Sequence, residues 1–144
     1  MPLWRSRSSK IALLQQVPLF EGLSQRQLEQ IGRLTDEVEV PAGKRLATAG
    51  DVGRELFVIV EGQASVTTAR ARTVRLGPGD FLGEMSLIDG EPRSANVVAA
   101  TPMRLLVVAH RDFWQLLDAA PPLTRRIMRT LSRRLRDAER TLTA

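Results

Sequence analysis

The chain has 144 residues, of which 43% are hydrophobic and 26% charged, and its formal net charge at pH 7 is +5. This length suits one domain with its own core, and the composition is typical of a globular chain rather than a disordered one. The absence of cysteine excludes disulfides, thiolate metal sites and cysteine nucleophiles. The apolar runs are too short to cross a bilayer or to act as a signal peptide. We therefore expect a cytoplasmic protein with no membrane span.

The positive charge is concentrated at the two ends of the chain. Residues 1–10 carry a net charge of +3, and residues 121–144 carry seven arginines against two acidic residues. A basic end can attract nucleic acid or acidic lipid, although an arginine-rich, solvated helix face gives the same pattern. Almost no aromatic residue that could stack on a base lies among these charges. We therefore expect no sequence-specific binding of DNA.

The N-terminal part of the chain has a helical pattern. Residues 1–9 are expected to be a disordered basic leader, and residues 10–35 are expected to be helical with an interruption at Pro18. Ser24 followed three residues later by Gln27 forms a capping box, which predicts the start of a second helix.

Residues 37–110 change to short apolar or alternating runs that turn residues divide at close intervals. The runs are 38–40, 45–47, 56–60, 64–68, 97–100 and 103–108. Many short strands with glycine-rich turns are typical of a compact β-sandwich or barrel. The middle of the chain is therefore predicted to be a β-core.

Helical patterning returns after this β-core. Residues 111–118 predict a short helix, and Pro121 and Pro122 break and restart the chain, since proline is tolerated in a first turn. A final helix over 122–142 has one apolar stripe. Its members are Leu123, Ile127, Leu131, Leu135, Ala138 and Leu142.

The segment 83–95 carries the most chemical information. It combines a glycine, a short helix-compatible run, a tight Asp-Gly turn and a strand that we expect to open at Arg93. Gly83 lets the backbone approach a ligand, and free N–H groups there favour an anion. Arg93 can bind phosphate oxygens in a forked geometry, and Glu84 can accept a hydrogen bond from a sugar hydroxyl. This set suits a sugar phosphate, although Glu84 and Arg93 could also simply pair with each other across the turn.

No residue set in the sequence suggests catalysis. His110 is the only histidine, so no histidine pair exists for a metal or for nucleophilic chemistry. Ser86 and Ser94 have no neighbouring base. We therefore expect neither an enzyme nor a metal site.

The runs 81–87 and 92–95 closely resemble the phosphate-binding cassette of the cyclic nucleotide-binding domain family, which includes the bacterial catabolite activator and the regulatory subunits of protein kinase A. Residues 17–24 look like the N-terminal helical segment of that family, and the turns at 41–43, 50–51 and 61–62 look like those of its β-roll. The resemblance implies an α+β fold in one domain over residues 10–144. This fold is a β-roll, a jelly-roll-like antiparallel sandwich, flanked by N-terminal helices and a long C-terminal helix.

The resemblance also implies a ligand-binding role for six residues. They are Gly83, Glu84, Met85, Ser86, Arg93 and Ser94. Glu84 matches the glutamate that accepts a hydrogen bond from the ribose 2′-hydroxyl, and Arg93 matches the arginine that neutralises the cyclic phosphate. Gly83, Met85 and Ser86 match positions whose backbone faces ribose or phosphate. Ser94 matches a serine whose hydroxyl adds to the phosphate contact in the bacterial activator, and it is also compatible with syn cGMP.

The base-binding end is less well defined by the resemblance. Val74 and Leu76 could line a base pocket. In the bacterial activator a threonine-serine pair on the C-terminal helix reads adenine, whereas Ala138 and Glu139 occupy those positions here. The expected ligand is cAMP, with cGMP as the alternative, and no other cofactor is expected.

The function implied by the resemblance is a sensor that binds a cyclic nucleotide and moves its C-terminal helix. One alternative is the sensor part of a DNA-binding transcription regulator, and another is a protein-interaction domain that binds no nucleotide. The helix of the bacterial activator pairs two protomers, and Leu131, Leu135, Ala138 and Leu142 approach the a/d seam of a coiled coil. We therefore also expect a homodimer.

Overall fold

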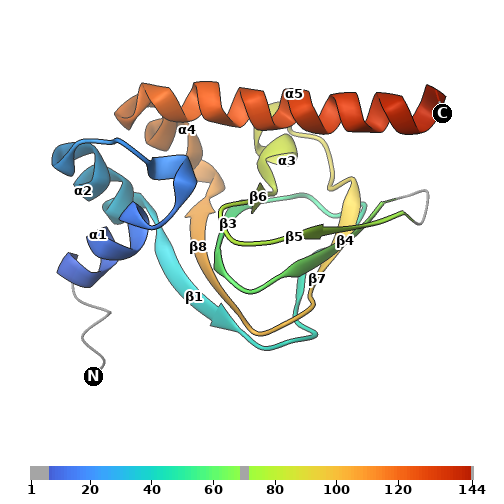
Figure 1. Ribbon diagram of the computed structural model, residues 1–144, viewed down its shortest axis with the longest axis horizontal. Helices are drawn as coiled ribbons and strands as arrows, with labels where there is room; N and C mark the ends of the chain where they lie inside the picture. The colour runs from blue at the N-terminus through green and yellow to red at the C-terminus, as the bar shows by residue number, and fades with distance from the viewer. Residues whose placement is uncertain (1–6, 69–71, 144) are drawn as a thin grey trace.

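Helices occupy the two ends of the chain and strands occupy its middle (Figure 1). The structure is a computed structural model that describes residues 7–68 and 72–143, with side chains over 10–68 and 72–140. The helices are α1 (Arg7–Gln15), the 3₁₀ helix η2 (Pro18–Phe20), α2 (Gln25–Leu34), α3 (Glu84–Asp89), α4 (His110–Ala119) and α5 (Pro121–Thr143). The strands are β1 (Asp36–Val40), β2 (Arg45–Ala47), β3 (Glu55–Glu61), β4 (Ala64–Thr68), β5 (Thr73–Leu76), β6 (Phe81–Leu82), β7 (Ala95–Ala99) and β8 (Met103–Ala109).

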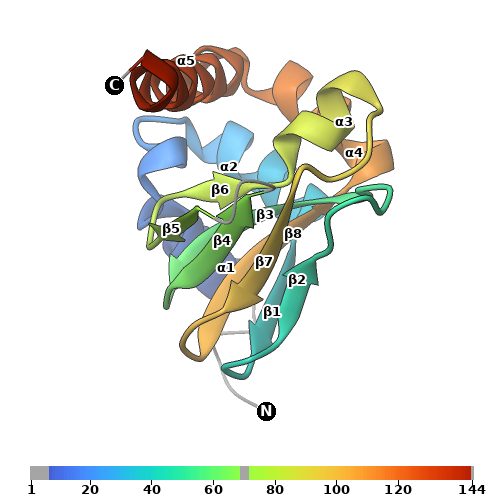
Figure 2. The same ribbon diagram turned by 90° about the vertical axis from the view of Figure 1, so that its right-hand side faces the viewer.

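The described strands form two four-stranded antiparallel sheets. Their orders are β1-β8-β3-β6 and β2-β7-β4-β5, and Figure 2 shows one sheet in front of the other. The core between the sheets includes Phe57 and Ile59 from the first sheet and Val97 and Ala99 from the second. The α+β fold class with a β-roll and a long C-terminal helix is confirmed.

Strands β3 and β8 are buried on both faces because helices cover the outer face of the first sheet. Successive side chains of a strand point to opposite faces. Leu56 and Val58 of β3 therefore pack against the helices, whereas Phe57 and Ile59 pack against the second sheet. Residues 105–108 of β8 divide in the same way. This double burial explains why both strands are continuous apolar runs in the sequence.

The predicted N-terminal cap of α2 is confirmed. The Ser24 hydroxyl accepts a hydrogen bond from the N–H of Gln27 at 3.1 Å, and the N–H of Ser24 donates to the Gln27 side-chain oxygen at 2.9 Å. The two bonds satisfy N–H groups that have no partner inside the helix. Leu28 and Ile31 of the same helix are buried in the helical core. The cap therefore fixes the first turn of α2.

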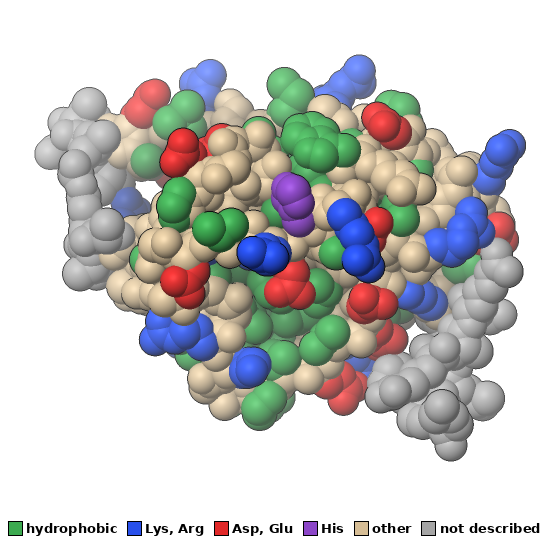
Figure 3. Space-filling view, turned by 180° about the vertical axis from the view of Figure 1, so that it is seen from behind, with side chains coloured by type: hydrophobic (Ala, Val, Ile, Leu, Met, Phe, Trp, Pro, Cys, Tyr) green, Lys and Arg blue, Asp and Glu red, His purple; other side chains and the backbone are tan. Residues whose placement is uncertain are grey.

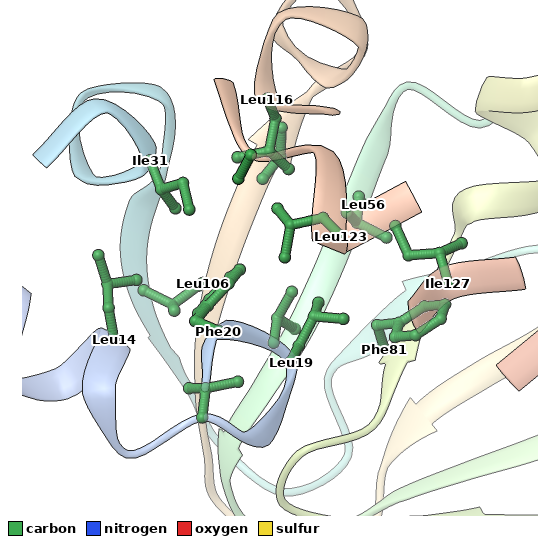
Figure 4. Close-up of a cluster of buried hydrophobic side chains, with 14 of the residues drawn as sticks. Leu14, Leu19, Phe20, Ile31, Leu56, Phe81, Leu106, Leu116, Leu123 and Ile127 are labelled. Carbon is green, nitrogen blue, oxygen red and sulfur yellow. The ribbon is translucent and has the colours of Figure 1, made fainter. Parts of the chain in front are cut away.

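The final helix changes its environment along its length. Leu123 and Ile127 are buried near Leu56 and Phe81 (Figure 4), and the Arg126 guanidinium donates to the Leu19 carbonyl at 2.6 Å. Figure 1 shows that α5 then continues past α3 and the second sheet. Its apolar stripe was expected to be continuous. The structure divides it into a buried half and an outer half.

Other bounds also differ from the sequence-based expectations. Residues 7–9, expected in the leader, begin α1, because the helix that buries Leu13 and Leu14 extends one turn further; residues 1–6 lie outside the described residues. Strands β5 and β6 were not anticipated, because they have only four and two residues and no long apolar run. The strand expected at Arg93 begins at Ala95.

Acidic and basic side chains are interspersed on the face of the molecule opposite to Figure 1 (Figure 3). Among residues 7–68 and 72–143, no helix is long and apolar enough to span a membrane. Within the same residues, no group of three acidic or histidine side chains is placed to hold a metal ion.

Candidate functional site

The segment 83–94 wraps one end of a pocket at the junction of the two sheets and α5. Gly83 directly follows β6 with a φ of +95° and allows α3 to begin at the next residue. A Cβ at Gly83 would lie 2.5 Å from the Glu55 carbonyl oxygen and from Nη1 of Arg93. Glycine is therefore required there both by the left-handed backbone and by the close approach of two polar groups.

The pocket has a volume of about 490 Å³, within the usual range of roughly 300–1,000 Å³ for small-ligand sites. The second sheet, the segment 82–86, the segment 93–95 and α5 provide its walls. All six residues expected to bind ligand line it, so the fold brings together positions that are up to eleven residues apart. Their binding role itself remains a prediction.

Arg93 is held by its backbone and by one side of its guanidinium. Its N–H donates to the Asp51 carbonyl at 2.7 Å, and its carbonyl accepts from the N–H of Gly50 at 2.9 Å. Nη2 donates to the Glu55 carbonyl at 2.8 Å. Nη1 is buried, and among the described residues it has no hydrogen-bond partner. Burial lowers the pKa of Arg93, against the opposing charges of Glu55 and Glu84. An anion in the pocket would satisfy this nitrogen.

Glu84 is an acidic group taken almost fully out of water, with 2% of its surface exposed. Its Oε1 accepts a hydrogen bond from Arg134 at 3.0 Å. Its Oε2 is buried and has no hydrogen-bond partner among the described residues. Burial raises the pKa of Glu84, although Arg134 and, more weakly, Arg93 act to lower it. A hydroxyl donor is the group that this second oxygen lacks.

Arg134 connects α5 to the segment that carries Glu84. Its second guanidinium nitrogen donates to the Phe81 carbonyl at 2.6 Å, and the guanidinium lies 4.9 Å from the centre of the Phe81 ring. Arg134 was not among the site residues predicted from the sequence. A signal was present, because Arg134 follows Ile127 by seven residues and Leu131 by three, which places it on the buried face of the helix.

Two different surfaces enclose the rest of the pocket. Side chains of the second sheet give it an apolar wall that includes Val66 and the two residues expected to contact a base, Val74 and Leu76. The opposite wall is the polar side of α5. It consists of Thr130, Arg133, Arg134, Asp137 and Ala138. Of the two positions matched to the threonine-serine pair, Ala138 therefore lines the pocket, whereas Glu139 is not part of its wall.

Glu84 and Arg93 do not pair with each other across the turn, which was the alternative expectation. Glu84 forms its ion pair with Arg134, fifty residues away, and Arg93 donates to a backbone carbonyl. Each therefore keeps one buried polar atom that the described residues leave unpaired. The unpaired carboxylate oxygen and the unpaired guanidinium nitrogen therefore belong to two residues that line the same pocket.

Comparisons with known proteins agree with this class of site. The chain matches the family described as "Cyclic nucleotide-binding domain" over residues 37–120. This match covers more than half of the chain, and the chain belongs to the cyclic nucleotide-binding domain family. It ends just before α5, so the helix that closes the pocket lies outside the matched residues.

Individual relatives include a potassium channel and a receptor protein. The chain is 44% identical over 111 residues to a cyclic nucleotide-gated potassium channel from Mesorhizobium japonicum, covering 77% of this chain and 31% of the channel. It is 32% identical over 127 residues to a cyclic AMP receptor protein from Thermus thermophilus, covering 85% and 59%. The chain thus spans about a third of the first and about three fifths of the second.

Solved structures give the same result for the fold. The catabolite activator protein of Thermus thermophilus has a TM-score of 0.75 at 32% identity, over 87% of this chain and 61% of that one. The regulatory subunit of a cAMP-independent protein kinase A from Trypanosoma brucei has a TM-score of 0.78 at 25% identity, over 88% of this chain and 46% of that one. These relatives are regulatory or sensor proteins, and no enzymatic family is among these matches.

The environment of Glu84 leads to a prediction for its titration. We expect carbon-detected NMR to give this carboxyl a pKa above that of exposed glutamates, because burial disfavours its charged form. Arg134→Gln should raise this pKa further by removing the nearest cation, whereas Arg133→Gln should change it less. Because the folded-state pKa is the higher one, the wild type should lose stability relative to Glu84→Gln as the pH rises from the unfolded-state to the folded-state pKa. A pKa at or below the ordinary value would contradict this description of the site.

Proposed function

We propose that this protein is a sensor domain that binds a 3′,5′-cyclic nucleotide, cAMP first, and transmits binding through α5. The observation that carries the proposal is a pair of buried, unpartnered atoms, Glu84 Oε2 and Arg93 Nη1, on two residues that line one pocket. A cyclic nucleotide supplies both missing partners, because its 2′-hydroxyl donates and its exocyclic phosphate oxygens accept. The base would then extend between the apolar sheet wall and α5.

The bound nucleotide would act on α5 through Glu84. This carboxylate already holds Arg134 of α5 through Oε1, so a ligand hydroxyl at Oε2 adds a second donor to the same group. A ligand shifts a conformational equilibrium only as far as it binds one state better than the other. The states proposed here differ in how α5 lies against the segment 81–86.

Two specific alternatives concern the ligand and the output. The regulatory subunit of a cAMP-independent protein kinase A from Trypanosoma cruzi is described as bound to guanosine, which carries no phosphate. The unpaired guanidinium nitrogen of Arg93 favours a phosphate here. Two outputs remain as alternatives. The receptor-protein relative is compatible with a domain that serves a DNA-binding regulator, and the channel relative is compatible with a domain that serves a channel. A protein-interaction role without nucleotide would leave two buried polar atoms unsatisfied.

Isothermal titration with cAMP, cGMP, adenosine and guanosine tests this function. We expect the wild type to bind the cyclic nucleotides, with cAMP the tighter, and to bind both nucleosides much more weakly. Arg93→Ala should weaken cAMP by about 2–5 kcal/mol, or roughly 30- to several-thousand-fold, because it removes one member of a desolvated charge pair. Arg75→Ala, on β5 outside the pocket lining, is the control. Nucleoside binding as tight as that of cAMP, or an Arg93→Ala affinity within threefold of the wild type, would exclude the phosphate assignment.

The same titrations test whether Glu84 contacts the ribose, by comparing the affinities of cAMP and a 2′-deoxy analogue. A 2′-deoxy analogue should bind the wild type about 1.5–3 kcal/mol less tightly, the usual size of a hydrogen bond to a charged group. In Glu84→Gln this penalty should shrink. An equal penalty in both proteins would remove Glu84 from the ribose contact.

Transmission through Arg134 can be measured by pulsed electron spin resonance. The sequence has no cysteine, so spin labels can be placed at Lys44→Cys and Arg136→Cys without further changes. We expect cAMP to shift the distance distribution in the labelled wild type. Arg134→Gln should reduce this shift while cAMP still binds, because it breaks the connection between α5 and Glu84. Arg129→Gln, an exposed position on α5, is the control, and an undiminished shift in Arg134→Gln would refute this route of transmission.

We also propose that the outer face of α5 joins two copies of the chain. Met128 and Leu135 are 63% and 61% exposed, and Leu131 between them is only partly buried. Together these three residues follow spacings of three and four, as in a two-stranded seam, whereas Ala138, also expected in the seam, lines the pocket. Of the expected seam, Leu142 has a side chain outside the described residues. Exposed apolar side chains in such a row favour a second copy as their cover.

The dimer should depend on Leu135 and on ionic strength. Leu135→Glu places a charge in the seam and should give a monomer that still binds nucleotide, whereas Gln115→Glu on the exposed side of α4 should remain dimeric. The seven arginines of each C-terminal segment would repel those of the partner, so added salt should strengthen pairing by screening. Sedimentation at tens of micromolar measures both effects. A wild-type monomer in high salt, with and without cAMP, would overturn the proposal.

A further inference from the structure

The loop between β2 and β3, residues 48–54, holds Arg93 through its backbone. Gly50 and Asp51 hold the backbone of Arg93 through two hydrogen bonds of 2.9 and 2.7 Å. Val52 and Pro92 form an isolated antiparallel β-bridge beside them. The arginine is thus fixed to this loop rather than to a regular strand, and its guanidinium crosses the loop to reach the Glu55 carbonyl.

Gly53 is the residue over which the guanidinium passes. A Cβ at position 53 would lie 2.5 Å from Cζ and Nε of Arg93 and 2.7 Å from Cβ of Ser86. These separations are much shorter than the roughly 3.5–4.0 Å of ordinary carbon contacts. Any side chain at position 53 must therefore displace the guanidinium, the first turn of α3, or both.

The backbone at Gly53 does not itself require glycine. Gly53 is absent from the residues of positive φ, which include Gly50 and Gly83. At Gly83 a substitution would strain the backbone as well as crowd the site, so its effect would be ambiguous. At Gly53 the reason for glycine is space alone, because Arg93 and Ser86 fill that space. Arg93 is expected to neutralise the phosphate, and the backbone of Ser86 is expected to face ribose or phosphate.

We propose that Gly53 is a positioning residue for the phosphate group of the ligand. Its missing side chain lets the Arg93 guanidinium lie between the 48–54 loop and Ser86, where Nη2 is used by Glu55 and Nη1 is left for the ligand. A side chain there moves the cation away from the place where the loop and α3 hold it. This inference rests on the proposed function, because it assigns Gly53 to the phosphate end of that pocket.

A graded series at Gly53 tests the inference by titration with cAMP. Gly53→Ala should weaken cAMP by about tenfold and Gly53→Val by more, since displacement of a charge-pairing group grows with the added volume. Gly77→Ala is the matched control, because Gly77 also lacks a positive φ and a Cβ there would meet nothing within 4 Å. It should bind within about threefold of the wild type, and thermal unfolding should show all variants folded.

Two further measurements separate positioning from a general loss of structure. In an Arg93→Ala background, Gly53→Ala should cause no additional loss of cAMP affinity, because the group that it displaces is gone. In the ligand-free protein, the Nε–H signal of Arg93 in nitrogen-15 NMR should shift in Gly53→Ala and stay in place in Gly77→Ala. This second readout does not require a nucleotide.

The outcomes distinguish the inference from the function on which it rests. A wild type that binds no cyclic nucleotide would overturn the proposed function. If Arg93→Ala loses binding while Gly53→Ala and Gly53→Val bind like the wild type, the function stands and the role of Gly53 is refuted. The same follows if the Arg93 signal is unchanged in Gly53→Ala, or if Gly53→Ala weakens binding equally with and without Arg93.

Discussion

The ion pair between Glu84 and Arg134 is the interaction on which the arrangement of the site depends. Removing a carboxylate from water costs several kcal/mol unless a cation and hydrogen bonds compensate it. Here the cation comes from α5, fifty residues further along the chain. As long as Glu84 is buried and ionised, α5 has to lie over the segment 81–86. The wall of the pocket and the position of the helix therefore have one physical cause.

This dependence gives α5 two successive roles. Its first turns are part of the core, since Leu123 and Ile127 fill the space above Leu56 and Phe81 (Figure 4). From Thr130 onward the same side of the helix faces the pocket with polar groups. The buried half has little freedom to move without opening a cavity. The second half is held by Arg134, so under the proposed function the motion in response to a ligand would be concentrated beyond Leu131.

An element of the fold could be predicted where the residues that form a local sequence pattern are also the residues that make its contacts in the folded protein. The capping box at Ser24 and the apolar runs of β3 and β8 are of this kind, because a cap is a local interaction and burial on both faces leaves no polar positions. Strand β6 has two residues and is defined only by its pairing with β3. Such a strand has no period to detect.

The cassette residues could be predicted for a related reason, and their partners could not. Gly83, Glu84 and Arg93 lie within eleven residues, so one short segment carries both charges and the turn between them. Arg134 and Gly53 act on those charges from other parts of the chain. In the sequence Arg134 is one arginine among seven in the C-terminal segment, and Gly53 resembles an ordinary turn residue. Only the tertiary contacts distinguish them.

The two charged ends of the site are supported by different parts of the fold. Arg93 is held by the β2–β3 loop and by a carbonyl of β3, which are elements of the β-roll. Glu84 is held by Arg134 of α5. A ligand group that meets Arg93 therefore meets a fixed part of the molecule, whereas a group that meets Glu84 meets a part connected to the helix. Under the proposed function, the phosphate should therefore contribute mainly to affinity, and the ribose hydroxyl is the part of the nucleotide best placed to influence α5.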